Sequence, residues 1–118
     1  MDIDLINWDD LEWADVEPGL RRKTYHGDGI TVTLHESMPG TEMPPPHSHV
    51  HEQIAYYLSG NSDFMVDGVV YKMKAGSIMA IPPNVPHCGH ATGTEPAVNL
   101  DIFVPQRPEH KASERKKK

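Results

Sequence analysis

Proline and glycine interrupt this sequence every few residues, and their spacing limits what the chain can fold into. The 118 residues include 11 prolines and 9 glycines. No long window places apolar residues every three or four positions, as an amphipathic helix requires. Because proline removes a backbone donor and glycine favours turns, mainly short extended segments fit between them. The chain is therefore expected to be all-β.

Short runs that alternate apolar and polar residues mark the expected strands. In residues 30–36, isoleucine, valine and leucine alternate with threonine and histidine, as in a strand with one buried face. Asp67 and Gly68 separate two other runs and are typical of a tight hairpin turn. Strands are expected at residues 20–26, 30–36, 53–59, 63–66, 69–73, 77–81 and 97–104. This spacing predicts a β-sandwich or a small barrel.

Charged residues gather at the two ends of the chain. The net charge is -6, with seven of the 17 acidic residues in positions 1–17 and five of the 11 basic residues in positions 110–118. The acidic start is compatible with either one helical turn or an edge strand. The length suits one domain, divided into an acidic arm (1–19), a barrel (20–106) and a basic, disordered tail (107–118).

Several classes of protein are excluded by the composition. The body between the charged ends has no broad basic face, so nucleic acid is not an expected partner. No apolar run approaches the roughly 18 residues of a membrane span, and the acidic start lacks the features of a signal peptide. Cys88 is the single cysteine, which rules out an intrachain disulfide. A cytoplasmic protein that does not bind membranes is expected.

A run of three prolines leads directly into a histidine cluster. Pro44–Pro46 forces His47 into extended geometry, and alternate residues of an extended chain point the same way, so His47 and His49 can bind one ion. Gln53 follows with matching parity, and His87 comes after a second proline-rich segment. An isolated pair of this kind also fits surface loop residues, but two such blocks in an all-β chain favour a metal site.

The two blocks resemble the two sequence motifs of the cupin family. The first motif, G(X)5HXH(X)3,4E(X)6G, corresponds to Gly40, His47, His49, Gln53 and Gly60. The second motif, G(X)5PXG(X)2H(X)3N, corresponds to Gly76, Pro82, Asn84, His87 and Ala91. One extra residue precedes His47, Gln53 replaces a glutamate, and Ala91 replaces an asparagine. The resemblance covers residues 25–104 and implies a jelly-roll barrel, also called a double-stranded β-helix.

The resemblance also implies that His47, His49, Gln53 and His87 are metal ligands. Three imidazoles and one amide oxygen form a neutral ligand set, so a bound ion keeps its full positive charge and polarises substrate oxygen strongly. One divalent transition metal ion per chain is expected. The ligand types do not distinguish among Ni, Mn, Fe, Co and Zn.

The remaining histidines and Cys88 are not interpreted as ligands. His51 has the parity of the ligands but lies at a turn, so it is expected either to support the site from behind or to be exposed. His90 is a candidate for supporting a ligand by a hydrogen bond. Cys88 has the opposite parity to His87 and is interpreted as packing. Exposed positions are expected for His26, His35 and His110.

The last expected strand, residues 97–104, carries two interleaved sets of side chains. Periodicity alone favours burial of the aliphatic set, Val98, Leu100, Ile102 and Val104. Among cupins, however, the chain is similar to small pectin-degradation cupins, which carry a D-x-F-x-x-x-R signature. Here that signature falls on Asp101, Phe103 and Arg107. The resemblance turns the polar set inward, and the aliphatic face would then be covered by a second subunit of a homodimer.

The pectin-degradation cupins convert 4,5-unsaturated uronates, products of pectin or alginate breakdown, to linear 4-deoxy-5-keto uronates. Their resemblance implies that the substrate is an anionic sugar. It assigns proton transfer to Asp101 and carboxylate binding to Arg107, with Phe103 and Tyr57 as walls of the pocket. The alternatives are a cupin-type metal oxygenase, an isomerase or polyketide-cyclase-like enzyme on another small molecule, and a module that binds a small molecule without turnover.

Overall fold

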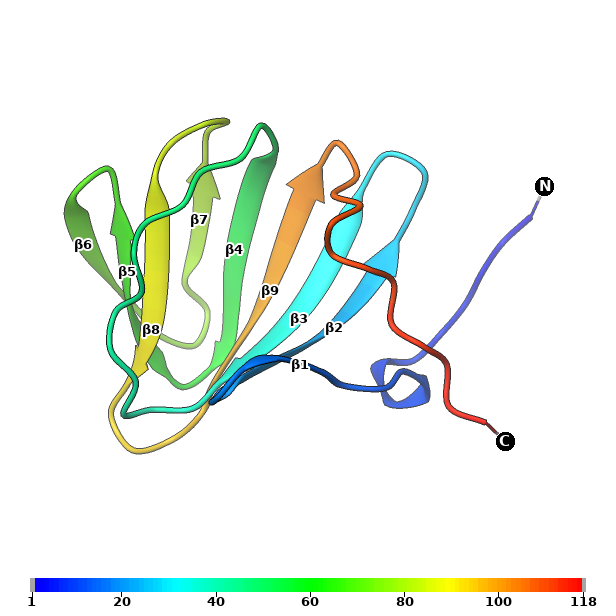
Figure 1. Ribbon diagram of the computed structural model, residues 1–118, viewed down its shortest axis with the longest axis horizontal. Coiled ribbons are helices and arrows are strands. Elements are labelled where there is room, and N and C mark those ends of the chain that lie inside the picture. The colour runs from blue at the N-terminus through cyan, green and yellow to red at the C-terminus, as the bar shows by residue number, and fades with distance from the viewer. Residues whose placement is uncertain (1, 118) are drawn as a thin grey trace.

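The chain folds into two antiparallel β-sheets that face each other, in agreement with the predicted all-β architecture (Figure 1). The computed structural model describes residues 2–117. Within this range the elements are a short 3-10 helix, η1 (Trp8–Asp10), and the strands β1 (Ala14–Glu17), β2 (Leu20–His26), β3 (Thr31–Ser37), β4 (Glu52–Ser59), β5 (Asn61–Val66), β6 (Val69–Met73), β7 (Ile78–Ile81), β8 (His87–Thr92) and β9 (Ala97–Val104).

The strand order inserts the last strand between earlier ones. Among the described residues, the larger sheet has the order β1-β2-β3-β9-β4-β7 and the smaller sheet the order β6-β5-β8. β9 therefore pairs along its whole length with β3 on one side and β4 on the other. This central position holds the side chains of β9 rigidly over the space between the sheets. β8 was expected only as an extended segment that begins at His87, because its residues do not alternate in hydropathy.

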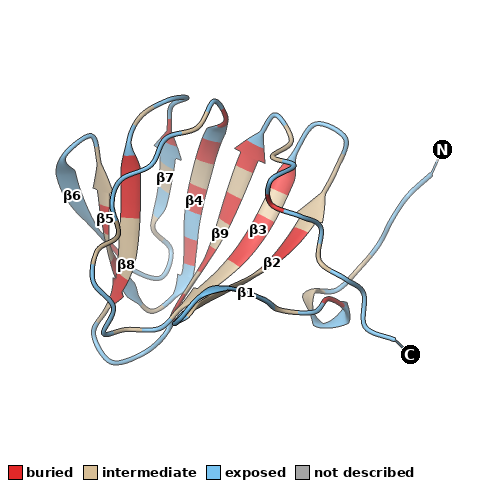
Figure 2. Ribbon diagram, viewed as in Figure 1, coloured by how far each residue is buried: buried red, intermediate tan, exposed pale blue. Residues whose placement is uncertain are grey.

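The core lies between the two sheets, and buried positions alternate with partly exposed ones along β9, β4 and β3 (Figure 2). One cluster of buried side chains packs near the smaller sheet: Tyr57, Phe64, Met73, Ile81, Ala91 and Ala97.

The turns between strands adopt the backbone conformations that their residue types predict. Asp67 and Gly68 both have positive φ, 49° and 83°, as the tight hairpin turn requires. Gly60 has φ 77°, and a Cβ there would lie 2.3 Å from the Pro96 carbonyl oxygen.

β9 turns its polar set inward. Ala97, Asn99, Asp101 and Phe103 are all buried, whereas the aliphatic set that periodicity favoured for the core faces outward, with Val104 49% exposed. The orientation implied by the resemblance is therefore observed. The outer face over β4, β7 and β9 remains apolar, with Tyr56 and Ile78 paired across neighbouring strands and both exposed. A second subunit that covers this face stays a prediction.

The two ends of the chain depart from the expected arm and tail. The acidic start forms both alternatives, a helical turn at η1 and an edge strand at β1. The segment after β9 runs back across β3 and β2 toward the N-terminal segment (Figure 1). Ser113 bonds the Thr24 backbone through its hydroxyl at 2.7 Å, and a β-bridge joins Leu11 to Arg115.

Residues 107–118 were expected to be a disordered tail, and Lys118 lies outside the described residues. The structure instead ties this segment to β2 and to residues 10–12 by backbone hydrogen bonds. In the described part of the chain, no helix is long and apolar enough to cross a membrane.

Candidate functional site

A cavity of about 420 Å³ opens between the two sheets. Its walls come from β2, β3, β4 and β9 on one side and from β5 and β8 on the other, and the loop before β4 and the segment after β9 also contribute side chains. The predicted site residues His47, Gln53, His87, Asp101, Phe103, Arg107 and Tyr57 all line this cavity. Sequence positions more than fifty residues apart are therefore gathered around one space.

His47 and His87 line one end of the cavity and meet His49, which is not itself among the lining residues. His47 and His87 exchange two backbone hydrogen bonds of 2.9 Å, so the loop that follows the proline run is joined to β8. The two ring centroids lie 4.5 Å apart, and that of His49 lies 4.9 Å from His87. One nitrogen from each of the three rings lies within 4.8 Å of the others. This is the spacing of ligands that share one cation.

The turn before β8 places His87. Asn84 stands where the second motif has a glycine, and it adopts φ 66°, a left-handed conformation that asparagine tolerates better than most residues. Its backbone nitrogen donates to the His49 carbonyl oxygen at 2.7 Å. The two motif segments are thus bonded directly to each other around the histidine cluster.

Hydrogen bonds behind the rings fix which nitrogens face the cavity. His49 Nδ1 donates to the His51 carbonyl oxygen at 3.0 Å, and His87 Nδ1 donates to the Val85 carbonyl oxygen at 2.9 Å. In a neutral imidazole the other nitrogen, Nε2, then carries a free lone pair. His87 Nε2 is buried and has no hydrogen-bond partner within residues 2–117. Such an unpaired buried lone pair fits a metal ligand.

The contact between His49 and Gln53 supports the same conclusion. His49 Nε2 lies 3.0 Å from Gln53 Oε1, although both atoms are acceptors once His49 Nδ1 carries the proton. The amide cannot turn without cost, because its nitrogen donates to Asp101 Oδ1 at 2.8 Å. Two acceptors that face each other become favourable partners when a cation lies within reach of both. The donor set therefore fits a divalent transition metal ion.

Two of the three imidazoles have lowered pKa values. Burial is the main cause that lowers the pKa of His47 to about 4, with further contributions from the neighbouring His87, Arg107 and His49 side chains. Burial is also the main cause that lowers the pKa of His49. Because metal ions bind the deprotonated imidazole, these shifts remove most of the competition from protons.

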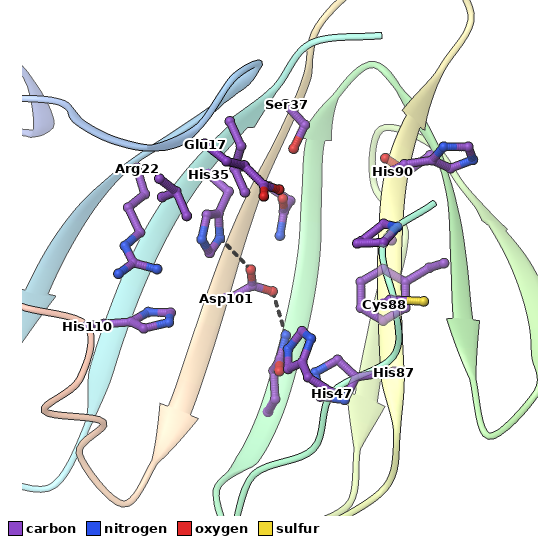
Figure 3. Close-up of a pocket in the computed structure, with 18 of the residues that line it drawn as sticks. Glu17, Arg22, His35, Ser37, His47, His87, Cys88, His90, Asp101 and His110 are labelled. Atoms are coloured by element: carbon purple, nitrogen blue, oxygen red, sulfur yellow. Dashed lines mark hydrogen bonds and ion pairs between the residues drawn. The ribbon is translucent and has the colours of Figure 1, made fainter. Parts of the chain in front are cut away.

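Asp101 occupies the middle of the cavity, between the histidine cluster and β3 (Figure 3). Its Oδ1 accepts from Gln53, and its Oδ2 accepts from His35 Nδ1 at 2.7 Å. Burial raises the pKa of this carboxyl, but hydrogen bonds from His35, Asn99 and Gln53 and the charge of His35 outweigh burial and lower it overall. The side chain is therefore a carboxylate held on both oxygens.

Phe103 and Arg107 complete the wall beside Asp101. Phe103 is 1% exposed, and its ring centroid lies 5.5 Å from that of His49. The Arg107 guanidinium lies 4.8 Å from the same ring. Tyr57 is buried on β4 below Gln53, and burial raises its pKa to about 12, so the phenol stays protonated. All four residues of the predicted catalytic and substrate-binding set face one cavity.

A comparison with protein families identifies the fold. The cupin domain model (Cupin_2) matches residues 33–103, a region that contains the histidine cluster, Asp101 and Phe103. The chain belongs to the cupin family. The predicted jelly-roll barrel is confirmed by this match and by the solved structures it resembles.

Relatives of this cupin include proteins of pectin degradation. It is 29% identical over 101 residues to the pectin degradation protein KdgF of Dickeya dadantii, a match that covers 84% of this chain and 90% of that protein. The structure of KdgF from a Halomonas species is 27% identical, with a TM-score of 0.78 over 86% of this chain and 94% of that one. An RmlC-like cupin from Shewanella frigidimarina is 25% identical, with a TM-score of 0.81 over 92% and 96% of the two chains.

Two residues of this cupin that line the cavity were missed in the sequence. His35 and His110 were expected to be exposed, but His35 bonds Asp101 and His110 is 6% exposed, with its Nδ1 3.0 Å from Thr33 Oγ1. His35 shares its strand face with buried Thr33 and Thr31. That face resembles a solvated one because all three side chains are polar, so its sequence pattern carried no signal of burial.

The other histidines of this cupin lie around the site rather than in it. His51 is buried and supports His49 through its backbone carbonyl, one of the two roles left open for it. His90 lines the mouth of the cavity but bonds the Thr41 carbonyl oxygen, so it supports no ligand. His26 is half-buried and bonds the His110 carbonyl oxygen, contrary to its expected exposure. Cys88 is buried beside the cavity.

Proposed function

We propose that this cupin is a metal-dependent enzyme that opens the ring of 4,5-unsaturated uronates to give linear 4-deoxy-5-keto uronates. The observation that carries the proposal is the position of Asp101, a buried carboxylate held between Gln53 and His35 beside a histidine cluster that fits a metal ion. The similarity to pectin degradation proteins supports the same substrate class.

His47, His49, Gln53 and His87 would hold the ion. Bound there, a divalent metal supplies Lewis acidity toward substrate oxygen atoms. The chain's own contribution is the rigid frame around it. The backbone carbonyls behind His49 and His87 fix two of the rings, and Asp101 fixes the amide of Gln53.

Asp101 would move the proton that the reaction needs. In the cyclic substrate the carboxylate takes the proton of the C1 hydroxyl, the C1–O5 bond breaks, and its electron pair leaves with O5 as an enolate conjugated to the C4–C5 double bond. Returning the proton to C4 yields the C1 aldehyde and the C5 ketone. No atom is gained or lost, so the step is an isomerisation by a general base that then acts as a general acid.

The other cavity residues would bind and shield the substrate. Arg107 would receive the sugar carboxylate by charge-assisted hydrogen bonds. Phe103 and Tyr57 close the wall of the cavity near Asp101, and by excluding water they strengthen the electrostatic interactions in the site.

Replacement of Asp101 by asparagine tests the proposal. The variant keeps an acceptor for the hydrogen bond from Gln53 but cannot take a proton, so we expect kcat to fall by roughly 100-fold or more. The assay follows the loss of ultraviolet absorbance of the ring double bond of an unsaturated monouronate, with metal-loaded protein. Asp63→Asn, on the neighbouring sheet and paired with Lys72, is the control and should match the wild type. No turnover by the wild type, or full activity of Asp101→Asn, would refute the proposal.

A further inference from the structure

The end of the cavity opposite the histidine cluster is lined by cationic and imidazole side chains. Figure 3 shows Arg22 and His110 on the far side of Asp101 from His47 and His87. Arg107 and His35 line the same cavity. This concentration is unexpected in a chain whose net charge is -6, and it places two guanidinium groups in one partly enclosed space.

Arg107 has no hydrogen-bonded anionic partner among the described residues. Its side chain is 14% exposed, and its buried Nε atom makes no hydrogen bond within residues 2–117. The nearest carboxylate, that of Glu109, lies 3.8 Å away and is 57% exposed. A guanidinium that loses its hydration without gaining a hydrogen-bonded partner is unfavourable. The position therefore favours an anion that the protein itself does not supply.

Arg22 lines the same cavity from strand β2, whereas Arg107 lies in the segment after β9. It lies on β2, half-buried, and makes neither a side-chain hydrogen bond nor an ion pair in the described part of the chain. Burial lowers its pKa. Its neighbour Arg21 points to the other face of β2, where it pairs with Glu36 at 2.7 Å and stacks on Trp13 at 4.1 Å. Of the two adjacent arginines, the inward one has no hydrogen-bonding or ion-pairing partner among residues 2–117.

Arg22 and Arg107 are close enough to influence each other and His110 electrostatically. Burial lowers the pKa of Arg107, and the charge of Arg22 lowers it further. Burial also lowers the pKa of His110 to about 3, with further contributions from Arg107 and Arg22. His110 is therefore a neutral part of the cavity wall near pH 7. The nearby carboxylate of Asp101 is already bonded on both oxygens, and Glu17 at the mouth is exposed.

We propose that Arg22 and Arg107 together form an anion subsite that takes the carboxylate of the substrate, with Arg22 as a specificity-determining residue. The subsite rests on the proposed uronate function. Phe103 links the two ends, because its ring contacts both the Arg107 guanidinium and the His49 ring. A uronate carboxylate is attached to C5, so holding it between the arginines directs C4 and C1 of the ring toward Asp101 and the histidine cluster.

The experiment compares Arg22→Gln with Arg21→Gln as the matched control. With Zn²⁺-loaded protein and an unsaturated monouronate, we expect Arg22→Gln to raise KM by roughly 10-fold or more with little change in kcat, and Arg21→Gln to leave both unchanged. Arg22→Lys keeps the positive charge but loses the planar set of guanidinium donors, so its KM should lie between those of the other two variants. Thermal unfolding of each variant checks that it folds. When the substrate is the carboxamide of the same sugar, Arg22→Gln and wild type should have similarly high KM values.

A binding measurement separates this subsite from the reaction. Calorimetry compares D-glucuronate with D-glucose on the same Zn²⁺-loaded proteins. Binding of glucuronate, but not glucose, that is lost in Arg22→Gln supports the subsite even if no variant turns over the unsaturated uronate, in which case only the proposed reaction fails. A wild type that does not bind glucuronate, or an unchanged KM in folded Arg22→Gln, overturns the subsite. An equal rise of KM for the acid and its carboxamide also overturns it.

Discussion

The two ends of the cavity are incomplete in opposite ways. At the histidine end, lone pairs converge: His87 Nε2 has no partner within residues 2–117, and His49 Nε2 faces the Gln53 oxygen. At the arginine end, Arg22 and Arg107 line the cavity, and the one carboxylate paired with either of them within residues 2–117 is that of exposed Glu109, 3.8 Å from Arg107 Nε. Asp101 lies between the two ends and is fully bonded.

This difference shows which parts of the cavity are satisfied by the chain itself. Buried polar groups in folded proteins are almost always paired, so groups left unpaired at a cavity wall indicate what the cavity is built to receive. A metal ion would complete one end and an organic acid the other. The bonded carboxylate between them needs no ligand to hold its geometry and is ready to exchange protons.

The largest expected effect comes from removing a ligand at the histidine end. His87→Ala removes the buried Nε2 atom that would bind the ion. We therefore expect metal affinity to fall by more than roughly 100-fold and activity to be lost. Elemental analysis after dialysis against a metal-free buffer gives the metal content. His90→Ala, on the same strand but bonded to the Thr41 carbonyl oxygen, should keep its metal. Equal metal content in the two variants would mean that the cluster is not the ligand set.

A smaller effect is expected where the two ends meet. Gln53→Glu adds a negative charge to the ligand set, so the ion should be bound more tightly but should polarise substrate less. The glutamate also cannot donate to Asp101, and two carboxylates would stand in place of the 2.8 Å hydrogen bond. We expect activity to fall roughly 10- to 100-fold with metal retained. Wild-type activity in the metal-loaded variant would show that the amide has no special role.

The smallest effect concerns stability at the arginine end. His110 stays neutral in the folded chain down to about pH 3, whereas in the unfolded chain it takes up a proton below about pH 6.5. Its contribution to stability is therefore present above pH 6.5 and is lost as the pH falls. Between pH 7 and pH 5 we expect the free energy of unfolding to drop by on the order of 1–2 kcal/mol. Urea unfolding in the presence of a chelator measures this drop, and His110→Gln should reduce it. An equal drop in both proteins would assign it to other groups.

The histidine end could be predicted from sequence because its signal is local. Proline geometry, the spacing of His47 and His49, and the parity of Gln53 depend on neighbouring residues only. The position of His87 came from the motif. The sequence also predicted most strands and the hairpin at Asp67 and Gly68, since turn residues mark them directly.

The arginine end could not be predicted in the same way. Arg22 and Arg21 are adjacent, and which one faces inward depends on the register of β2 against β3. His35 and His110 looked like surface residues, because burial among polar neighbours leaves no hydropathy pattern. The inward turn of Asp101 was opposed by periodicity and came only from the family resemblance. These positions depend on which strands become neighbours, which local sequence does not encode.

The segment after β9 brings Arg107 and His110 to the cavity and is then tied back to the start of the chain. Glu12 donates to the Glu114 carbonyl oxygen, and Lys116 donates to the Asp10 carbonyl oxygen, each at 2.8 Å. The proposed anion subsite is therefore divided between this peripheral segment, which carries Arg107, and strand β2 of the barrel, which carries Arg22. Cleavage of the chain between Val104 and Arg107 would therefore release Arg107 and His110 from the pocket while it left every described strand intact.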